Sequence, residues 1–296
     1  MDESKSLVIE QIQLILYFGL MGVLINWLAY SKGYFFFQKV ELSKPSDSTI
    51  VRFKQVAAVF LIYLGLLILV GPLIGKVLKK IWTPTTAASA FTFNVLLQLF
   101  VILISAFALF LYCRRQDRKE IKRIWKDSTL LPHHSWAFDF SLGILSWFIS
   151  FPIVVVVGQT ADLLLYVLFG FEGYEQVAVQ YLKMTLTSPL LLSVALFTVI
   201  ITAPVIEEFL FRGFLQNYLK RYLGKKAAIL SSSLCFALFH LAPSQGLGNI
   251  SLAISLFIFA CFLGFIYERQ KSLFASIGLH MTFNLVSTLR ILFIQE

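Results

Sequence analysis

The chain has 296 residues, of which 58% are hydrophobic and 14% charged, whereas about 25% of the residues in an ordinary soluble domain are charged. Its 30 Phe and 5 Trp residues lie in long apolar runs that lipid accepts but one water-soluble core could not bury, so soluble and disordered proteins are excluded. The formal charge of +9 comes from basic residues between the apolar segments, a distribution that argues against nucleic acid as a partner.

Eight segments of the chain are apolar enough to cross a membrane, which takes about 20 residues of helix. They lie near residues 10–30, 56–74, 88–112, 138–158, 188–216, 227–243, 250–267 and 273–294. The first of them lacks the small-x-small pattern of a cleavage site, so we interpret it as a retained span rather than a signal peptide. The sequence therefore predicts an all-α, polytopic membrane protein of about eight transmembrane helices.

The connection from Gly158 to Thr187 differs from these segments. It carries charged residues among leucines and tyrosines, namely Asp162, Glu172, Glu175 and Lys183. This mixture favours an amphipathic helix at the membrane surface over a ninth span.

A basic, polar loop from Arg114 to Trp136 is the best candidate for a domain boundary. We expect an amino-terminal transmembrane region of about three spans, residues 1–135, and a motif-bearing core of five spans, residues 136–296. With eight spans, 19 of the lysines and arginines fall on one side of the membrane and 6 on the other. This asymmetry predicts that the basic loops are cytoplasmic and that both termini face outward. We expect a multi-pass protein of a bacterial inner (plasma) membrane.

Ionisable side chains inside a bilayer cost about 2.5–3.5 kcal/mol each, so their presence in the last five spans needs a reason. At about 1.5 Å per helical residue, Glu207 lies about 20 Å from the basic loops and His240 about 22 Å. His280 and Asn284 lie about 14 and 20 Å deep, measured from the same side. Polar groups from three helices therefore converge on one layer of the membrane, as a functional cavity requires.

The spacing of the residues assigns the two adjacent glutamates to different faces. Glu208 and Arg212 are four residues apart and can pair along one helix face. Glu207 points about 100° away, and its own neighbours one turn later, Leu210 and Phe211, supply no cation. A carboxylate in an apolar site is suited to act as a base near neutral pH, so Glu207 is the candidate base.

The histidines lie on faces of their own. His280 and Asn284 share a helix face, where an imidazole and an amide can donate to a developing oxyanion. Phe236 and His240 likewise share a face. The structural alternatives are a simple salt bridge for Glu208 with Arg212 and a packing role for either histidine.

Three further features concern helix geometry, metals and the remaining reactive residues. Pro204 is expected to kink its helix and free a backbone carbonyl. Glu207, His240 and His280 form a zinc-like set, but the H-E-x-x-H motif is absent and each ligand comes from a different span, so we expect no cofactor, with zinc as the alternative. His133 and His134 are interpreted as solvated, and Cys113, Cys235 and Cys261 as packing residues.

Three ordered motifs resemble those of the CPBP family, the CAAX prenyl protease and bacteriocin-processing intramembrane proteases. They are EEFLFRG over residues 207–213, F-x-x-x-H from Phe236 to His240, and H-x-x-x-N from His280 to Asn284, within residues 188–288. The resemblance implies hydrolysis of a peptide bond inside the membrane, with Glu207 and His240 activating water. It also implies that His280 and Asn284 hold the oxyanion, while Glu208 and Arg212 orient the site.

The implied partners are membrane lipid and a peptide or a lipidated, membrane-associated protein. Because some CPBP proteins act as scaffolds or immunity proteins, a non-catalytic membrane protein on the same fold is the alternative. A transporter is a weaker alternative, because the chain shows no repeated halves.

Overall fold

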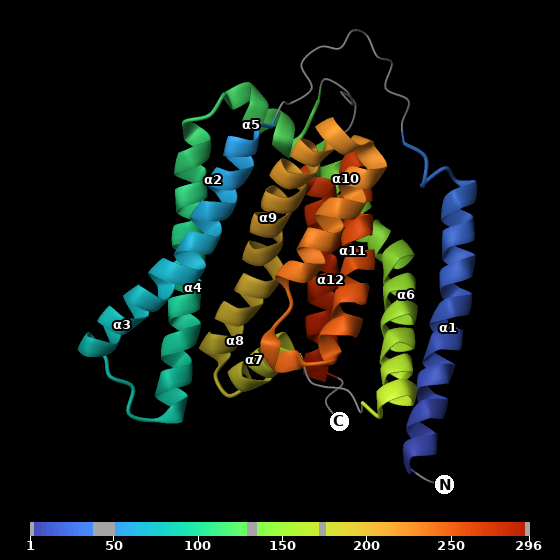
Figure 1. The fold of residues 1–296 in the computed structure, drawn as a ribbon, viewed down its shortest axis with the longest axis horizontal. Helices are drawn as coiled ribbons and strands as arrows, with labels where there is room; N and C mark the ends of the chain where they lie inside the picture. The colour runs from blue at the N-terminus through green and yellow to red at the C-terminus, as the bar shows by residue number, and fades with distance from the viewer. Residues whose placement is uncertain (1–2, 38–50, 129–134, 172–175, 294–296) are drawn as a thin grey trace.

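The computed structural model describes residues 3–37, 51–128, 135–171 and 176–293, and this part of the chain is helical, with no strand beyond an isolated bridge between Lys126 and Ser272 (Figure 1). The helices before the motifs are α1 (Glu3–Ser31), α2 (Phe53–Leu64), η1 (Gly65–Val70), α3 (Gly71–Ile81), α4 (Ala87–Arg114), α5 (Arg118–Trp125), α6 (Trp136–Phe169) and α7 (Val177–Thr185). The remaining helices are α8 (Pro189–Leu196), η2 (Phe197–Thr202), α9 (Ala203–Glu208), η3 (Phe209–Gln216), α10 (Asn217–Phe239), η4 (Pro243–Gln245), α11 (Gly248–Gln270) and α12 (Leu273–Phe293). The predicted all-α class is confirmed.

Six helical runs of the described chain are long and apolar enough to span a membrane. Five of them correspond to the predicted spans one to four and seven. The predicted spans 188–216 and 227–243 lie together in one run of 51 residues, Pro189–Phe239, which is broken at Gly224 by a φ of 75°. The last predicted span, α12, is not among the six, so the count of eight is not confirmed.

The fourth span and the connection after it differ from the prediction. Helix α6 continues past Gly158 to Phe169, because the run LLLYVLF keeps it apolar, and it ends at Gly170, which has a φ of 64°. Helix α7 has only nine residues, too few to cross a bilayer. Of the charged residues in this connection, Asp162 lies in α6 and Lys183 in α7, whereas Glu172 and Glu175 lie outside the described residues.

The motif-bearing helices occupy the middle of the molecule, flanked on both sides by amino-terminal helices (Figure 1). Helix α1 packs along α6 on one side, whereas α2 contacts η3 and α4 contacts α8 on the other. The division at residue 135 stays a prediction. His133 and His134, which precede α6 in the sequence, lie outside the described residues. The three cysteines are unpaired.

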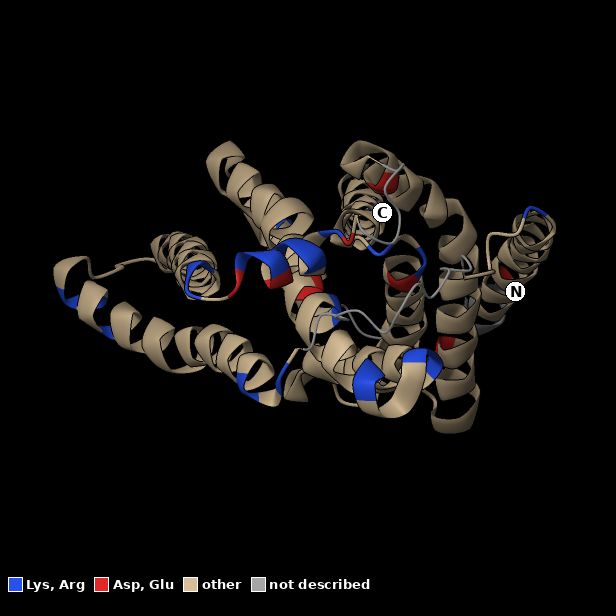
Figure 2. Cartoon of the chain, turned by 90° about the horizontal axis from the view of Figure 1, so that it is seen from above, with Lys and Arg blue, Asp and Glu red and all other residues tan. Residues whose placement is uncertain are grey.

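The basic loops meet at one end of the molecule, the end seen in Figure 2. The Gln55 amide donates to Glu120 across 3.1 Å and joins α2 to α5. The backbone N–H of Asp127 donates to the Lys271 carbonyl across 2.8 Å and joins the end of α5 to the α11–α12 turn. Their location at one end agrees with the predicted charge asymmetry, and the cytoplasmic orientation of this end stays a prediction.

Helices α6 and α12 approach each other closely at two glycines. A Cβ atom on Gly143 would lie 2.1 Å from the Ala275 carbonyl oxygen, and one on Gly278 would lie 2.4 Å from the Phe140 carbonyl oxygen. Both obstacles are backbone atoms, which cannot rotate away. Small residues bring the helices into direct backbone contact, the usual basis of helix association in lipid. Because Gly278 lies two residues before His280, this contact also positions the third motif.

We predict that Gly143→Ala lowers the free energy of unfolding by about 1–3 kcal/mol, since the added methyl group forces the two backbones apart. Gly65→Ala is the matched control, because no atom lies within 4 Å of its Cβ position. Alanine in a helix there should be neutral or stabilising by up to about 1 kcal/mol. Thermal unfolding of the two variants in detergent measures the difference. Equal melting temperatures would contradict the close α6–α12 contact.

Candidate active site

The helix that carries the first motif changes hydrogen-bond register just before it. In η2 the N–H of Ala203 donates to Thr198, five residues back, so Pro204 would be the donor to Val199 in the same register. Proline has no N–H to give. The side-chain amide of Asn284, on α12, donates to the Val199 carbonyl across 2.8 Å instead. The third motif thus supplies a donor to this carbonyl, whereas the predicted kink at Pro204 stays a prediction.

Glu208 and Arg212 form the predicted pair, with an Oε1 to Nη1 distance of 3.0 Å and both side chains fully buried. The same carboxylate oxygen accepts a hydrogen bond from Nδ1 of His280 across 2.9 Å. Arg212 also donates from Nη2 to the carbonyl of Ala260 on α11, across 3.1 Å. Its guanidinium carbon lies 4.6 Å from the ring centre of Phe236, a cation–π contact. This pair therefore contacts α10, α11 and α12.

Glu207 points away from this pair, as the helical spacing predicts, and faces the two histidines of the later motifs. Its Oε2 atom lies 3.6 Å from Nε2 of His240 and 3.8 Å from Nε2 of His280. These distances exceed a direct hydrogen bond and suit groups that share a water molecule. The helix of Glu207 supplies no cation to its carboxylate, as the spacing indicates. Imidazoles from α10 and α12 face this carboxylate instead.

The hydrogen bonds of the two imidazoles decide which nitrogen faces Glu207. Nδ1 of His240 lies 2.8 Å from the Phe236 carbonyl, and Nδ1 of His280 lies 2.9 Å from Glu208. Both partners can only accept, so each Nδ1 carries a proton. In the neutral imidazoles both Nε2 atoms are then acceptors, directed at a carboxylate. A proton or a water molecule between these atoms relieves their repulsion.

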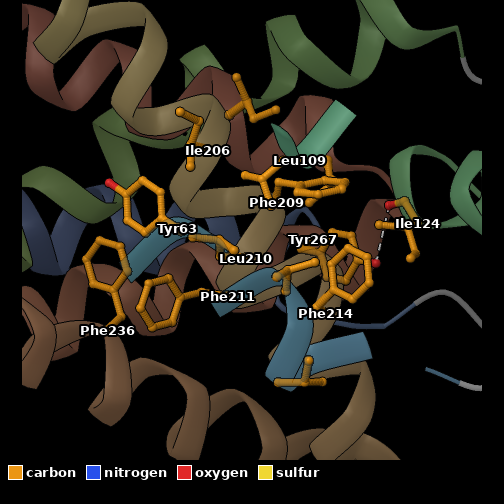
Figure 3. Packing of buried hydrophobic residues seen from close by; sticks show 14 of the residues in the cluster. Tyr63, Leu109, Ile124, Ile206, Phe209, Leu210, Phe211, Phe214, Phe236 and Tyr267 are labelled. Atoms are coloured by element: carbon orange, nitrogen blue, oxygen red, sulfur yellow. Dashed lines mark hydrogen bonds between the residues drawn. The ribbon is translucent and has the colours of Figure 1, made fainter. Parts of the chain in front are cut away.

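Aromatic side chains enclose this arrangement. Phe236 lies 4.5 Å from the ring of His240 and 5.8 Å from that of His280, between centroids, and Phe259 lies 5.4 Å from His280. Behind Phe236, Phe211 packs edge-on at 5.2 Å, and both appear with Tyr63 at one end of the buried cluster in Figure 3. Phe236, which the sequence analysis predicted to support the site, therefore forms one wall of it.

The structure brings Glu207, Glu208, Arg212, His240 and His280 together, but it places Asn284 differently. Within the described residues, no hydrogen bond joins the Asn284 amide to the other motif residues, and the amide donates to the Val199 carbonyl instead. Its assignment as an oxyanion donor stays a prediction. In the structure this side chain joins α12 to the segment before the first motif through its hydrogen bond to Val199.

Two contributors were missed by the sequence analysis. Tyr63 of α2 is 6% exposed and packs in the same buried cluster as Phe211 and Phe236. Gln216 is fully buried, accepts from Ser232 and donates to the Gly264 carbonyl, and so ties η3 to α10 and α11. Gln216 could have been recognised from the sequence, because a polar glutamine in a predicted span needs a reason. Tyr63 could not, because tyrosine is common in membrane helices.

No group of three or more His, Cys, Asp or Glu side chains is arranged to hold a metal ion in the part of the chain that the structure describes. The zinc alternative would need Glu207, His240 and His280, and these three do not meet that description. The expectation of no cofactor, with zinc as the alternative, stays a prediction that chelation tests.

We predict that Asn284→Leu lowers the free energy of unfolding by about 1–3 kcal/mol, since it leaves the Val199 carbonyl without a donor. In a Pro204→Ala background, residue 204 regains an N–H, and the same substitution should cost less than about 1 kcal/mol. Thermal unfolding of the four proteins in this double-mutant cycle measures the coupling. Additive effects would show that Asn284 does not compensate for Pro204.

One comparison with known proteins gives a match. Residues 189–286, which are 98 of the 296 residues, match the family model described as type II CAAX prenyl endopeptidase Rce1-like. Neither a curated protein nor a solved structure matches the chain. The matched segment contains all three motifs. This segment is therefore similar to the CAAX prenyl protease family that the motifs predicted.

Proposed function

We propose that this protein is an intramembrane endopeptidase that hydrolyses a peptide bond of a membrane-associated substrate with water activated by Glu207 and His240. The single observation that carries the proposal is the convergence of two Nε2 atoms on the Glu207 carboxylate, at 3.6 and 3.8 Å, inside a membrane-spanning run. Ionisable side chains are energetically unfavourable inside a membrane, and where they occur they mark functional sites.

The proposed reaction uses these side chains as acid and base. The Glu207 carboxylate takes a proton from water, and the resulting hydroxide attacks the carbonyl carbon of the peptide. The C–N bond then breaks, and the leaving nitrogen receives a proton from His240 as an imidazolium, or from Glu207. Glu208 and Arg212 hold His280 in place through its Nδ1 atom.

His280 is the proposed donor to the oxyanion, and the hydrogen bonds set a condition on this role. Because its Nδ1 proton is given to Glu208, His280 can donate from Nε2 only when it carries both protons. Asn284 retains one amide hydrogen beyond that given to Val199, which is the only one it could offer an oxyanion.

The proposed substrate is a peptide or a lipidated protein, and the proposed location is a bacterial inner membrane. The family match and the long apolar helices support a protease that works on substrates at or in the membrane. A non-catalytic scaffold or immunity protein on the same fold is the alternative, and the following experiment separates the two.

Glu207→Gln should lower turnover by about 100-fold or more while leaving the melting temperature unchanged, because glutamine keeps the size of the side chain but is no base. Wild-type and variant protein are each purified, reconstituted and incubated with membranes. Cleavage is measured by comparing the proteomes of the two sets of membranes. If Glu207→Gln cleaves as fast as wild type, the proposed base is wrong. If wild type cleaves nothing in any membrane, the non-catalytic alternative holds.

Glu208→Gln should act on stability as well as on rate, because it leaves Arg212 without its counter-charge in a fully buried position. Breaking a buried pair costs about 3–5 kcal/mol, whereas removing both charges costs far less. The double variant Glu208→Gln/Arg212→Met should therefore recover part of the melting temperature. A Glu208→Gln protein that lost cleavage but kept full stability would reverse the roles of the two glutamates.

Cleavage should survive exhaustive chelation, because a carboxylate and an imidazole can activate water without a metal. Metal analysis of the active protein should find less than about one equivalent of zinc. Loss of cleavage on chelation, with recovery specifically on adding zinc, would make His240 and His280 ligands and Glu207 a ligand or the base.

A further inference from the structure

A pocket lies on the face of the α9–η3 segment opposite to Glu207. It encloses about 430 Å³ and is bounded by α4, α5 and the α9–η3 segment. Its apolar walls include Ala106 and Leu109 of α4, Trp125 of α5, and Ile206 and Phe209 beside the glutamates. The volume lies in the range of about 300–1,000 Å³ that is typical of small-ligand sites.

The rim of this pocket is strongly basic. Arg114, Arg118 and Lys122 follow one another at intervals of four residues from the end of α4 along α5, and all three line the pocket and are exposed. Within the described chain, none of them forms an ion pair with a carboxylate. Three cations without an ion-pair partner beside an apolar cavity suit a ligand that has an anionic group and apolar chains.

The position of the pocket indicates where such a ligand comes from. Helix α5 lies at the basic end of the molecule, where the membrane-spanning α4 ends, and Trp125 on the same helix is the residue type that marks membrane interfaces. Basic pockets between transmembrane helices at this level bind the headgroups of anionic lipids. The apolar walls run from there into the depth of the membrane.

We propose that this pocket binds one anionic phospholipid, with its phosphate against Arg114, Arg118 and Lys122 and an acyl chain between α4 and α9. The site is separate from the proposed active site, because Val205 and Phe209 face the pocket whereas Glu207 faces His240 and His280. The bound lipid supports the back of the helix on which Glu207 lies.

The test is native mass spectrometry of the full-length protein in detergent, titrated with dioleoyl phosphatidylglycerol or dioleoyl phosphatidylcholine. Wild type should bind one phosphatidylglycerol at least about tenfold more tightly than phosphatidylcholine. Each basic side chain near an anionic lipid surface contributes about a factor of five. The variant Arg114→Gln/Arg118→Gln/Lys122→Gln should therefore weaken phosphatidylglycerol binding about 100-fold. Ala106→Phe, which fills the apolar wall, should weaken the binding of both lipids.

The matched control is Arg115→Gln/Lys119→Gln/Lys226→Gln, which removes the same charge from exposed positions outside the pocket. It should keep its affinity within about twofold. Equal affinity for the two lipids, or an equal loss in the control, would overturn the proposal. So would displacement of the lipid by a prenylated peptide, which would make the pocket a substrate site. These readouts are independent of peptide cleavage, so the proposed function can fail without affecting them.

Discussion

The buried ion pair between Glu208 and Arg212 is the interaction on which the rest of the site depends. Inside a membrane neither charge can be solvated by water, so each must be paired by the protein. The carboxylate binds His280 of α12, and the guanidinium binds the Ala260 carbonyl of α11 and stacks on Phe236 of α10. One charge pair thus fixes the relative positions of four helices, and this frees Glu207 to face the histidines.

A second constraint is that backbone polar groups in hydrocarbon need partners. The change of register before Pro204 leaves one carbonyl without a donor, and Asn284 supplies it. Gly278 holds the same helix, α12, against α6 by backbone contact. His280 lies between these two attachments. The imidazole that meets both glutamates is therefore positioned by the packing of its whole helix.

The membrane-interface end of the molecule is coupled to the site through one helix. Ile124 of α5 is fully buried and packs against Gly213 of η3. A Cβ atom on Gly213 would lie only 2.9 Å from Cγ2 of Ile124. The small residue that ends the first motif therefore lets α5 pack directly on η3. Phe209 of η3 also lines the basic pocket, so a ligand there and a substrate at Glu207 would contact opposite faces of the same segment.

The sequence by itself determined the helical membrane class, the pairing of Glu208 with Arg212, and the common depth of Glu207, His240 and His280, because hydropathy and helical spacing are local properties. Only the tertiary structure decided the length of α6, the Nδ1 partners of the histidines, the attachment of Asn284 and the basic pocket. These features arise where residues far apart in the chain approach within a few ångströms. Such approaches depend on side-chain volume and backbone hydrogen-bond register in three dimensions, which no spacing along one helix encodes.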